Sequence, residues 1–249
     1  MDKEQSTPQG MEHSKIIAEV AKETLEPLGI FQKGRSRSWI DDRGWWIVNI
    51  EFQPSGSSKG SYLNVAAMWL WDENDFFTFD FGNDVGGRIA GFVEYVDEKQ
   101  FTPEALRLSS LAKAEALRLR SKFVSIHDAA LYLPAKARRD DSPWTKLAAA
   151  IALGYVGKTF RARRLFKSLE RKEPVHEWEY KLQERARGFA ESLDSPNDFQ
   201  RYVKEAIWRT RKLLKLPERT ELGSFDEKQH HGVSRLLRAR FEVLRTMFR

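Results

Sequence analysis

The spacing of hydrophobic residues changes twice along the chain. Residues 12–28 place apolar side chains at helical spacing, and Pro27 and Gly29 mark the end of this amphipathic helix. The next stretch is rich in aromatic and β-branched residues separated by turn residues, a pattern typical of strands. Four strands are expected, with a possible fifth at 89–95: 31–40, 45–53, 61–71 and 76–81.

The second of these strands indicates how the sheet faces the core. Apolar side chains alternate with polar ones, so each kind lies on its own face of the strand. The apolar face holds Trp46, Val48, Ile50 and Phe52, and the polar face holds Asn49, Glu51 and Gln53. This alternation predicts an antiparallel sheet with one side buried.

After residue 100 the pattern returns to the helical period. Thr102-Pro103, Ser142-Pro143 and Ser195-Pro196 each offer an N-cap hydroxyl followed by proline at the first helical position. Ser125-Ile126-His127-Asp128 resembles a capping box with Asp in the Glu position. Helices are expected at 103–122, 126–134, 143–156, 159–171, 175–193 and 196–215. Residues 217–231 are polar and are expected to be a linker, followed by a last helix at 233–248.

These elements predict an α+β protein. An N-terminal helix and an antiparallel four- or five-stranded meander sheet would be followed by a mostly helical C-terminal half. The expected division is an α+β domain at 12–135, a helical region at 136–216, and a linker with a basic helix at 217–249.

Residues 143–174 resemble one helical hairpin of the tetratricopeptide type. Gly157 would form the turn, small and large residues would alternate at the interface, and Pro174 would end the unit. Ala150 and Leu153 hold the small and large positions of the first helix, and Ala162 and Phe166 hold the matching positions of the second. The next core positions would hold Glu184, Arg187 and Pro196, so a repeat array is not expected.

Charge is distributed unevenly between the two halves. Residues 1–100 carry 10 Lys+Arg and 17 Asp+Glu, whereas residues 101–249 carry 32 and 19. A basic half can indicate an anionic partner such as nucleic acid. Attraction between the two halves of the same chain would explain the split equally well.

The last helix concentrates this basic charge. Its apolar stripe is flanked by arginines and a single acid, Glu242. The arginines, and hence the candidate binding residues, are Arg235, Arg238, Arg240, Arg245 and Arg249. Such a helix could bind phosphates, an anionic membrane or a partner groove, or it could cover the protein's own core.

Composition excludes several classes of site. The chain has no cysteine, so disulfides, thiolate nucleophiles and cysteine-bound metals are excluded. Its longest apolar run, 147–157, is shorter than the roughly 18 residues of a membrane span. A cytoplasmic protein without cofactor or metal is therefore expected. Eight tryptophans, five of them between Trp39 and Trp71, indicate either a core or an aromatic binding surface.

No catalytic signature is complete. The serines at 55–58 lie in a turn rather than at a nucleophile elbow, and the match to a phosphate loop at 154–159 lacks its first glycine. A remote alternative is a metal-dependent nuclease, which gathers an acid and a Glu-x-Lys or Glu-x-Gln step around a divalent cation. Its candidate residues are Asp42, Glu51 and Gln53.

Three short motifs occur in a suggestive order. They are Glu-Pro-Leu-Gly-Ile-Phe-Gln-Lys at 26–33, Trp-Trp-Ile-Val-Asn-Ile at 45–50 and Tyr-Leu-Asn-Val at 62–65. Over about residues 14–135 the chain thereby resembles an uncharacterised bacterial family of unknown function, although Ile30-Phe31 stands where one aromatic residue is usual. The resemblance implies an α+β meander fold, often followed by the helical hairpin, and implies no activity.

Together these patterns favour a binding protein over an enzyme. The preferred hypothesis is an interaction module with an unidentified protein partner. The alternative is a nucleic-acid-binding protein that uses its basic helical half, and the nuclease is the remote third.

Overall fold

The computed structural model describes residues 12–82 and 85–225. Its centre is a five-stranded antiparallel meander sheet in which each strand pairs with the next along the chain. The strands are β1 (Phe31–Gln32), β2 (Ser38–Asp42), β3 (Trp46–Glu51), β4 (Gly60–Trp69) and β5 (Arg88–Glu94). The predicted α+β class and the antiparallel sheet are confirmed.

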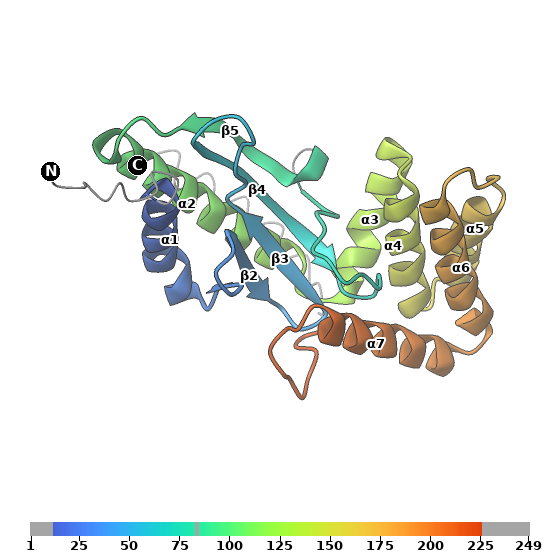
Figure 1. Cartoon of the computed structure of the whole chain (residues 1–249). Coiled ribbons are helices and arrows are strands. Elements are labelled where there is room, and N and C mark those ends of the chain that lie inside the picture. The colour runs from blue at the N-terminus through green and yellow to red at the C-terminus, as the bar shows by residue number, and fades with distance from the viewer. Residues whose placement is uncertain (1–11, 83–84, 226–249) are drawn as a thin grey trace, which may run out of the picture.

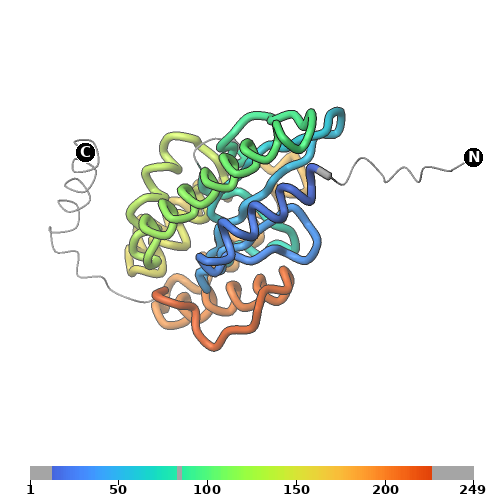
Figure 2. The backbone as a smooth tube through the Cα atoms, turned by 90° about the vertical axis from the view of Figure 1, so that its left-hand side faces the viewer, coloured from blue at the N-terminus to red at the C-terminus, as the bar shows by residue number. Residues whose placement is uncertain are grey.

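Two long helices cover one face of the sheet, and five more form the C-terminal half. Figure 2 shows the first two, α1 (Glu12–Leu25) and α2 (Glu98–Lys122), side by side across the sheet. Figure 1 shows the other helices beyond the end of the sheet, with α7 running beneath. They are α3 (Ile126–Asp140), α4 (Pro143–Tyr155), α5 (Thr159–Glu170), α6 (Glu177–Glu191) and α7 (Pro196–Leu213). Short 3-10 turns lie at Glu26–Leu28, Val85–Gly87 and Ser192–Asp194.

Both faces of β3 are buried, so the expectation of a one-sided sheet is wrong. Trp46 packs edge-on against Phe123 at the end of α2, with 5.8 Å between the ring centroids. On the opposite face Asn49 is buried because the segment 72–82 folds back over it. Asn49 Nδ2 donates to the carbonyl of Thr78, and the Thr78 N–H donates to Met68 Sδ at 3.4 Å.

Two of the expected strands differ in the structure. The range 31–40 is divided into β1 and β2 by a turn in which the Lys33 N–H donates to the Ser38 carbonyl at 2.9 Å. The range 76–81 forms no strand, and only Phe81 pairs with Ala67 on β4. Phe77 and Phe81 pack on the core instead of extending the sheet, and Phe76 and Phe79 line a cavity described below. Composition alone does not separate these roles from strand pairing.

Helix boundaries follow the predicted caps at three of four places. Ser142 and Ser195 cap α4 and α7, and Ser125 with Asp128 forms the expected capping box. The α2 helix instead begins after Asp97, whose carboxylate accepts from the Gln100 N–H, so Pro103 lies inside it. Helix α3 likewise continues through Pro134, beyond the expected end at residue 134.

The helices α4 and α5 form the expected hairpin. Gly157, at a φ of +75°, supplies the left-handed residue of the turn. The four predicted interface residues are all buried: Ala150, Leu153, Ala162 and Phe166.

Arginines of the helical half bind carboxylates of the sheet half. These pairs span more than 75 residues of sequence. They are Arg120 with Asp41, Arg211 and Arg219 with Asp42, Arg185 with Asp72, and Arg209 with Glu73. Three of the carboxylates, those of Asp41, Asp42 and Asp72, are at most 14 % exposed, whereas the pair on Glu73 is partly exposed to solvent. Attraction between the halves thus accounts for part of the charge asymmetry.

The buried apolar side chains form one continuous core through both halves. Helix α3 crosses the expected domain boundary at residue 135, so the chain passes from sheet to helices without a linker there. Among the described residues, no helix has the length and apolar character needed to cross a membrane.

Candidate functional site

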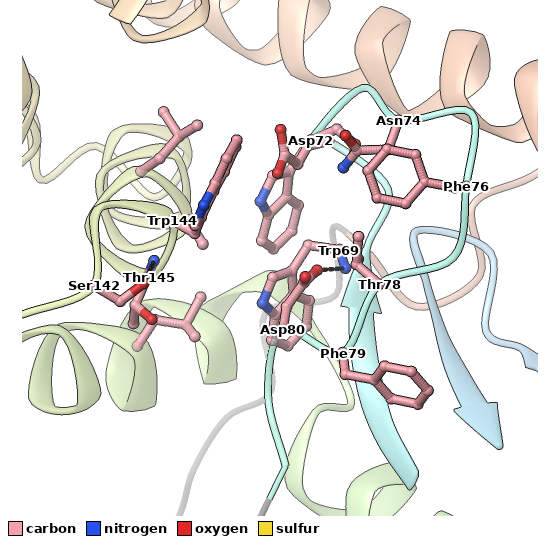
Figure 3. Close-up of a pocket in the computed structure, with 14 residues that line it drawn as sticks. Trp69, Asp72, Asn74, Phe76, Thr78, Phe79, Asp80, Ser142, Trp144 and Thr145 are labelled. Atoms are coloured by element: carbon pink, nitrogen blue, oxygen red, sulfur yellow. Dashed lines mark hydrogen bonds between the residues drawn. The ribbon is translucent and has the colours of Figure 1, made fainter. Parts of the chain in front are cut away.

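A cavity of about 360 Å³ lies where the sheet half meets the helical half. One wall is the end of β4 and the segment that follows it, and the other is formed by α3 and the start of α4. Figure 3 shows Asp72, Asn74 and Asp80 on one side, with Ser142, Trp144 and Thr145 across from them. Its volume and its position between two parts of a fold are typical of ligand sites.

The wall that carries Asp72 and Asp80 is formed by the segment 72–82, which runs back along the end of β4 without forming a regular strand. The Asp80 N–H donates to the Ala67 carbonyl at 2.9 Å, and the Ala67 N–H donates to the Phe81 carbonyl at 2.9 Å. Two residues further along β4, at Trp69, no neighbouring strand supplies a carbonyl group to accept from the backbone N–H. The Asp80 Oδ2 accepts from the Trp69 N–H instead, at 2.7 Å (Figure 3). The carboxylate thereby satisfies a backbone donor that a neighbouring strand would otherwise satisfy.

Two members of a stack of three tryptophans, Trp69 and Trp71, line the cavity. Trp45, Trp69 and Trp71 stack nearly parallel, and the Trp69 and Trp71 centroids are 5.2 Å apart with an angle of 6° between the planes. Trp71 is fully buried, yet its Nε1–H has no acceptor among the described residues. Trp144, on α4, is 37 % exposed and stacks on Trp178 of α6. The five tryptophans between Trp39 and Trp71 are therefore all buried in the core, and two of them, Trp69 and Trp71, also line the cavity.

Asp80 is a buried carboxyl without a cationic partner. No lysine, arginine or histidine among the described residues forms an ion pair with it, and none lines the cavity. Burial, together with the negative charge of nearby Asp72, raises the pKa of Asp80 to about 7. The group can therefore gain or lose a proton near neutral pH.

Asp72 is a second carboxyl in the same wall, with a different environment. Burial raises its pKa, and the charge of Arg185 from α6 partly opposes this effect. The neighbouring residue Glu73 is held by Arg209 of α7 at 2.7 Å. Two helices thus fix the segment in place, which leaves Asp80 as the carboxyl whose charge is unmatched.

The residues proposed for a nuclease do not come together. The Asp42 carboxylate accepts hydrogen bonds from both terminal guanidinium nitrogens of Arg211, each at 2.8 Å. Burial alone would raise the pKa of Asp42, but these bonds and the Arg211 charge lower it below its usual value. Asp42 pairs with Ile47, whereas Glu51 pairs with Ser38, four positions away along β2. At about 3.3 Å per residue, this places the two acids roughly 13 Å apart.

Glu51 and Gln53 belong to a separate polar cluster on the sheet. Asn64 Nδ2 donates to Glu51 Oε2 at 3.1 Å and to Gln53 Oε1 at 2.9 Å, and Arg88 donates to the same Gln53 oxygen. Within residues 12–82 and 85–225 no group of three or more metal-binding side chains occurs. Asp42, Glu51 and Gln53 therefore have structural partners and share no site.

The candidate arginines of the last helix lie outside the described residues. They are Arg235, Arg238, Arg240, Arg245 and Arg249. The cavity residues Asp72, Asp80 and Trp144 were not predicted, although clustered tryptophans followed by acids at 72–80 were a visible signal. Comparison of the chain with protein-family models, with curated proteins and with solved structures found no match.

Proposed function

We propose that this protein binds a small organic cation in the tryptophan-walled cavity. The observation that carries the proposal is Asp80, a carboxyl without an ion-pair partner that faces a cavity lined with aromatic rings. Aromatic faces attract ammonium groups, and a carboxylate nearby adds a charge of opposite sign. A ligand that brings its own positive charge would supply what Asp80 lacks.

The unpaired indole N–H of Trp71 indicates a second feature of the ligand, a hydrogen-bond acceptor. Trp71 Nε1 is a buried donor without an acceptor, which is costly unless a bound molecule supplies one. The ligand would therefore carry a hydrogen-bond acceptor, such as a hydroxyl, a few bonds from its ammonium group. A volume of about 360 Å³ accommodates a molecule of this size.

The test is a titration of the full chain with choline, followed by tryptophan fluorescence. The matched control ligand is 3,3-dimethyl-1-butanol, which has the shape of choline and no charge. Choline should bind at least about tenfold more tightly than the neutral molecule, because only choline pairs with the Asp80 carboxylate. Equal affinity for the two molecules would contradict the proposal.

The Asp80→Asn variant tests the same contact from the protein side. It should bind choline about tenfold more weakly, whereas Asp75→Asn, an exposed acid of the same segment, should bind it normally. Choline affinity of the unaltered chain should rise with pH through about 7, because Asp80 must lose its proton to pair with the cation. Unchanged affinity in Asp80→Asn would exclude this carboxyl.

Nucleic-acid binding is a second candidate, supported by the surface of α5. Phe160 is 75 % exposed, and basic side chains are exposed on both sides of it. These are Lys158, Arg161, Arg164 and Lys167. Basic residues around an exposed aromatic ring are typical of proteins that bind single-stranded nucleic acid.

Fluorescence anisotropy with labelled DNA and RNA tests this second candidate. If α5 binds phosphates, affinity should fall steeply with salt, and Arg161→Gln with Arg164→Gln should reduce the salt slope by about 2. Arg107→Gln, on the exposed side of α2, is the control.

The protein partner that the sequence analysis favoured stays a prediction.

A further inference from the structure

A second recess, with the opposite charge, lies at the other end of β4. It has an open volume of about 520 Å³ and is bounded by the start of α1, the residue before β2, and the loop between β3 and β4. Three basic side chains line it: His13, Arg37 and Lys59. No acidic residue among the described parts of the chain lines it.

Arg37 holds two hydrogen-bond donors that nothing in the described structure accepts. Its Nη1 donates to the Gly60 carbonyl at 3.3 Å, but Nε and Nη2 are buried and lack partners. Burial lowers the pKa of Arg37, and no carboxylate opposes the effect. A guanidinium presents Nε and a terminal nitrogen as a planar fork that matches two oxygens of a phosphate or carboxylate.

His13 adds a third unpartnered nitrogen from a different element. Its side chain is 8 % exposed, packs against the rings of Tyr95 and Phe101, and leaves Nδ1 without a partner. Burial lowers the pKa of His13, and the positive charges of Arg37 and Lys59 lower it further. Both cations act on the imidazole because all three side chains line the same recess.

The loop at 54–59 gives the recess a rim of hydroxyl groups. Ser55, Ser57 and Ser58 line the recess, and Ser57 N–H donates to Ser55 Oγ at 3.2 Å. Gly60 ends the loop at a φ of +147°, where a Cβ atom would lie 2.1 Å from the Val93 carbonyl oxygen. Only glycine fits at this position, so the backbone beside Lys59 is held close to β5.

We propose that this recess binds the phosphate group of a small phosphate monoester. Arg37 would bind two phosphate oxygens through Nε and Nη2, while Lys59 and the serine hydroxyls would contact the outer oxygens. A dianion is favoured because three basic groups converge and none has an acidic partner among the described residues. This site is independent of the cation cavity.

The test is an NMR titration of the full chain with inorganic phosphate at pH 7.5 and constant ionic strength. Imidazole resonances of the five histidines are followed, and a His13→Gln variant assigns the resonance of His13. Phosphate should shift the His13 resonance in a saturable manner and leave His127 unchanged. No shift of His13 up to tens of millimolar phosphate overturns the proposal.

Paired variants separate a built site from general attraction of anions. Arg37→Gln should weaken phosphate binding at least about fivefold. Arg35→Gln removes the same charge from an exposed position two residues away and should leave the affinity unchanged. If Arg37→Gln does not fold, Lys59→Gln on the exposed loop replaces it. Equal affinities for Arg37→Gln and Arg35→Gln overturn the proposal.

Discussion

The two ends of β4 carry sites of opposite charge. Among the described residues, the cavity at the Trp69 end is lined by Asp72 and Asp80 and by no basic side chain, whereas the recess at the Gly60 end is lined by three basic side chains and no acidic one. The ten residues of β4 separate them by roughly 30 Å. Each end therefore keeps its own electrostatic character.

The ends also differ in how their charges are matched. Arg185 neutralises Asp72 in the cavity, so only Asp80 remains without a partner there. In the recess, His13 and Arg37 both contain nitrogens that the described structure leaves unpaired. Removal of one member of a buried ion pair is strongly destabilising, because the other charge is left buried without a partner. Removal of a charged group that has no ion-pair partner causes no such loss. Substitution of Arg185 should therefore lower the stability of the protein substantially, whereas substitution of Arg37 should change it little.

The largest effect is expected from Arg185→Ala. The Asp72 side chain is only 14 % exposed in the intact protein, and loss of the guanidinium removes its cationic partner, which should reduce the free energy of unfolding by about 3 kcal/mol. Urea denaturation at pH 7 measures the change. Arg187→Ala, on the exposed side of the same helix, should cost less than about 0.5 kcal/mol. Similar losses for both variants would mean that the pair with Asp72 contributes little.

Asp80→Asn should instead stabilise the protein at alkaline pH. The folded-state pKa of Asp80 is about 7 against 3.8 for the ordinary side chain, so ionisation opposes folding increasingly as the pH rises from about 4 to 7. The variant lacks this penalty and should be more stable by on the order of 2 kcal/mol at pH 8, with the gain disappearing toward pH 4. Thermal unfolding across this range measures it. A constant difference at all pH values would contradict the raised pKa.

Arg37→Gln should alter stability by less than about 1 kcal/mol, because no ion pair is lost. Within residues 12–82 and 85–225, its only hydrogen bond is the long one to the Gly60 carbonyl. Urea denaturation of the Arg37→Gln and Arg185→Ala variants under the same conditions compares the loss of stability at the two ends of β4. A loss above about 2 kcal/mol would show that Arg37 has a stabilising partner.

The smallest effect concerns His13. Because the positive charge of Arg37 lowers the pKa of His13, Arg37→Gln should raise that pKa, and Arg35→Gln should not. Imidazole NMR titration in the absence of phosphate measures both. In the folded protein the lowered pKa disfavours protonation, so His13 reduces stability as the pH falls through its ordinary value of 6.5.

Much of the fold could be predicted because its signals are local. Ser142, Ser125 and Ser195 begin helices through hydrogen bonds to residues three positions ahead, and these bonds depend on neighbours in sequence. Strands β3 and β4 were expected from alternation and turn residues. The range 76–81 has similar composition, yet its Asp80 replaces a strand by binding Trp69 N–H. That outcome depends on where β5 ends its pairing with β4.

The sequence by itself determined most of the element types, most of the helix caps and the uneven charge of the halves. Only the tertiary structure decided which charges are paired. Arg211 and Arg185 bind carboxylates more than 100 residues away. In the described part of the chain, Asp80 has no cationic partner and Arg37 has no carboxylate partner, and nothing in the local sequence distinguishes these cases. Whether a charged group is matched depends on which distant segment folds against it, because desolvation and pairing act through space.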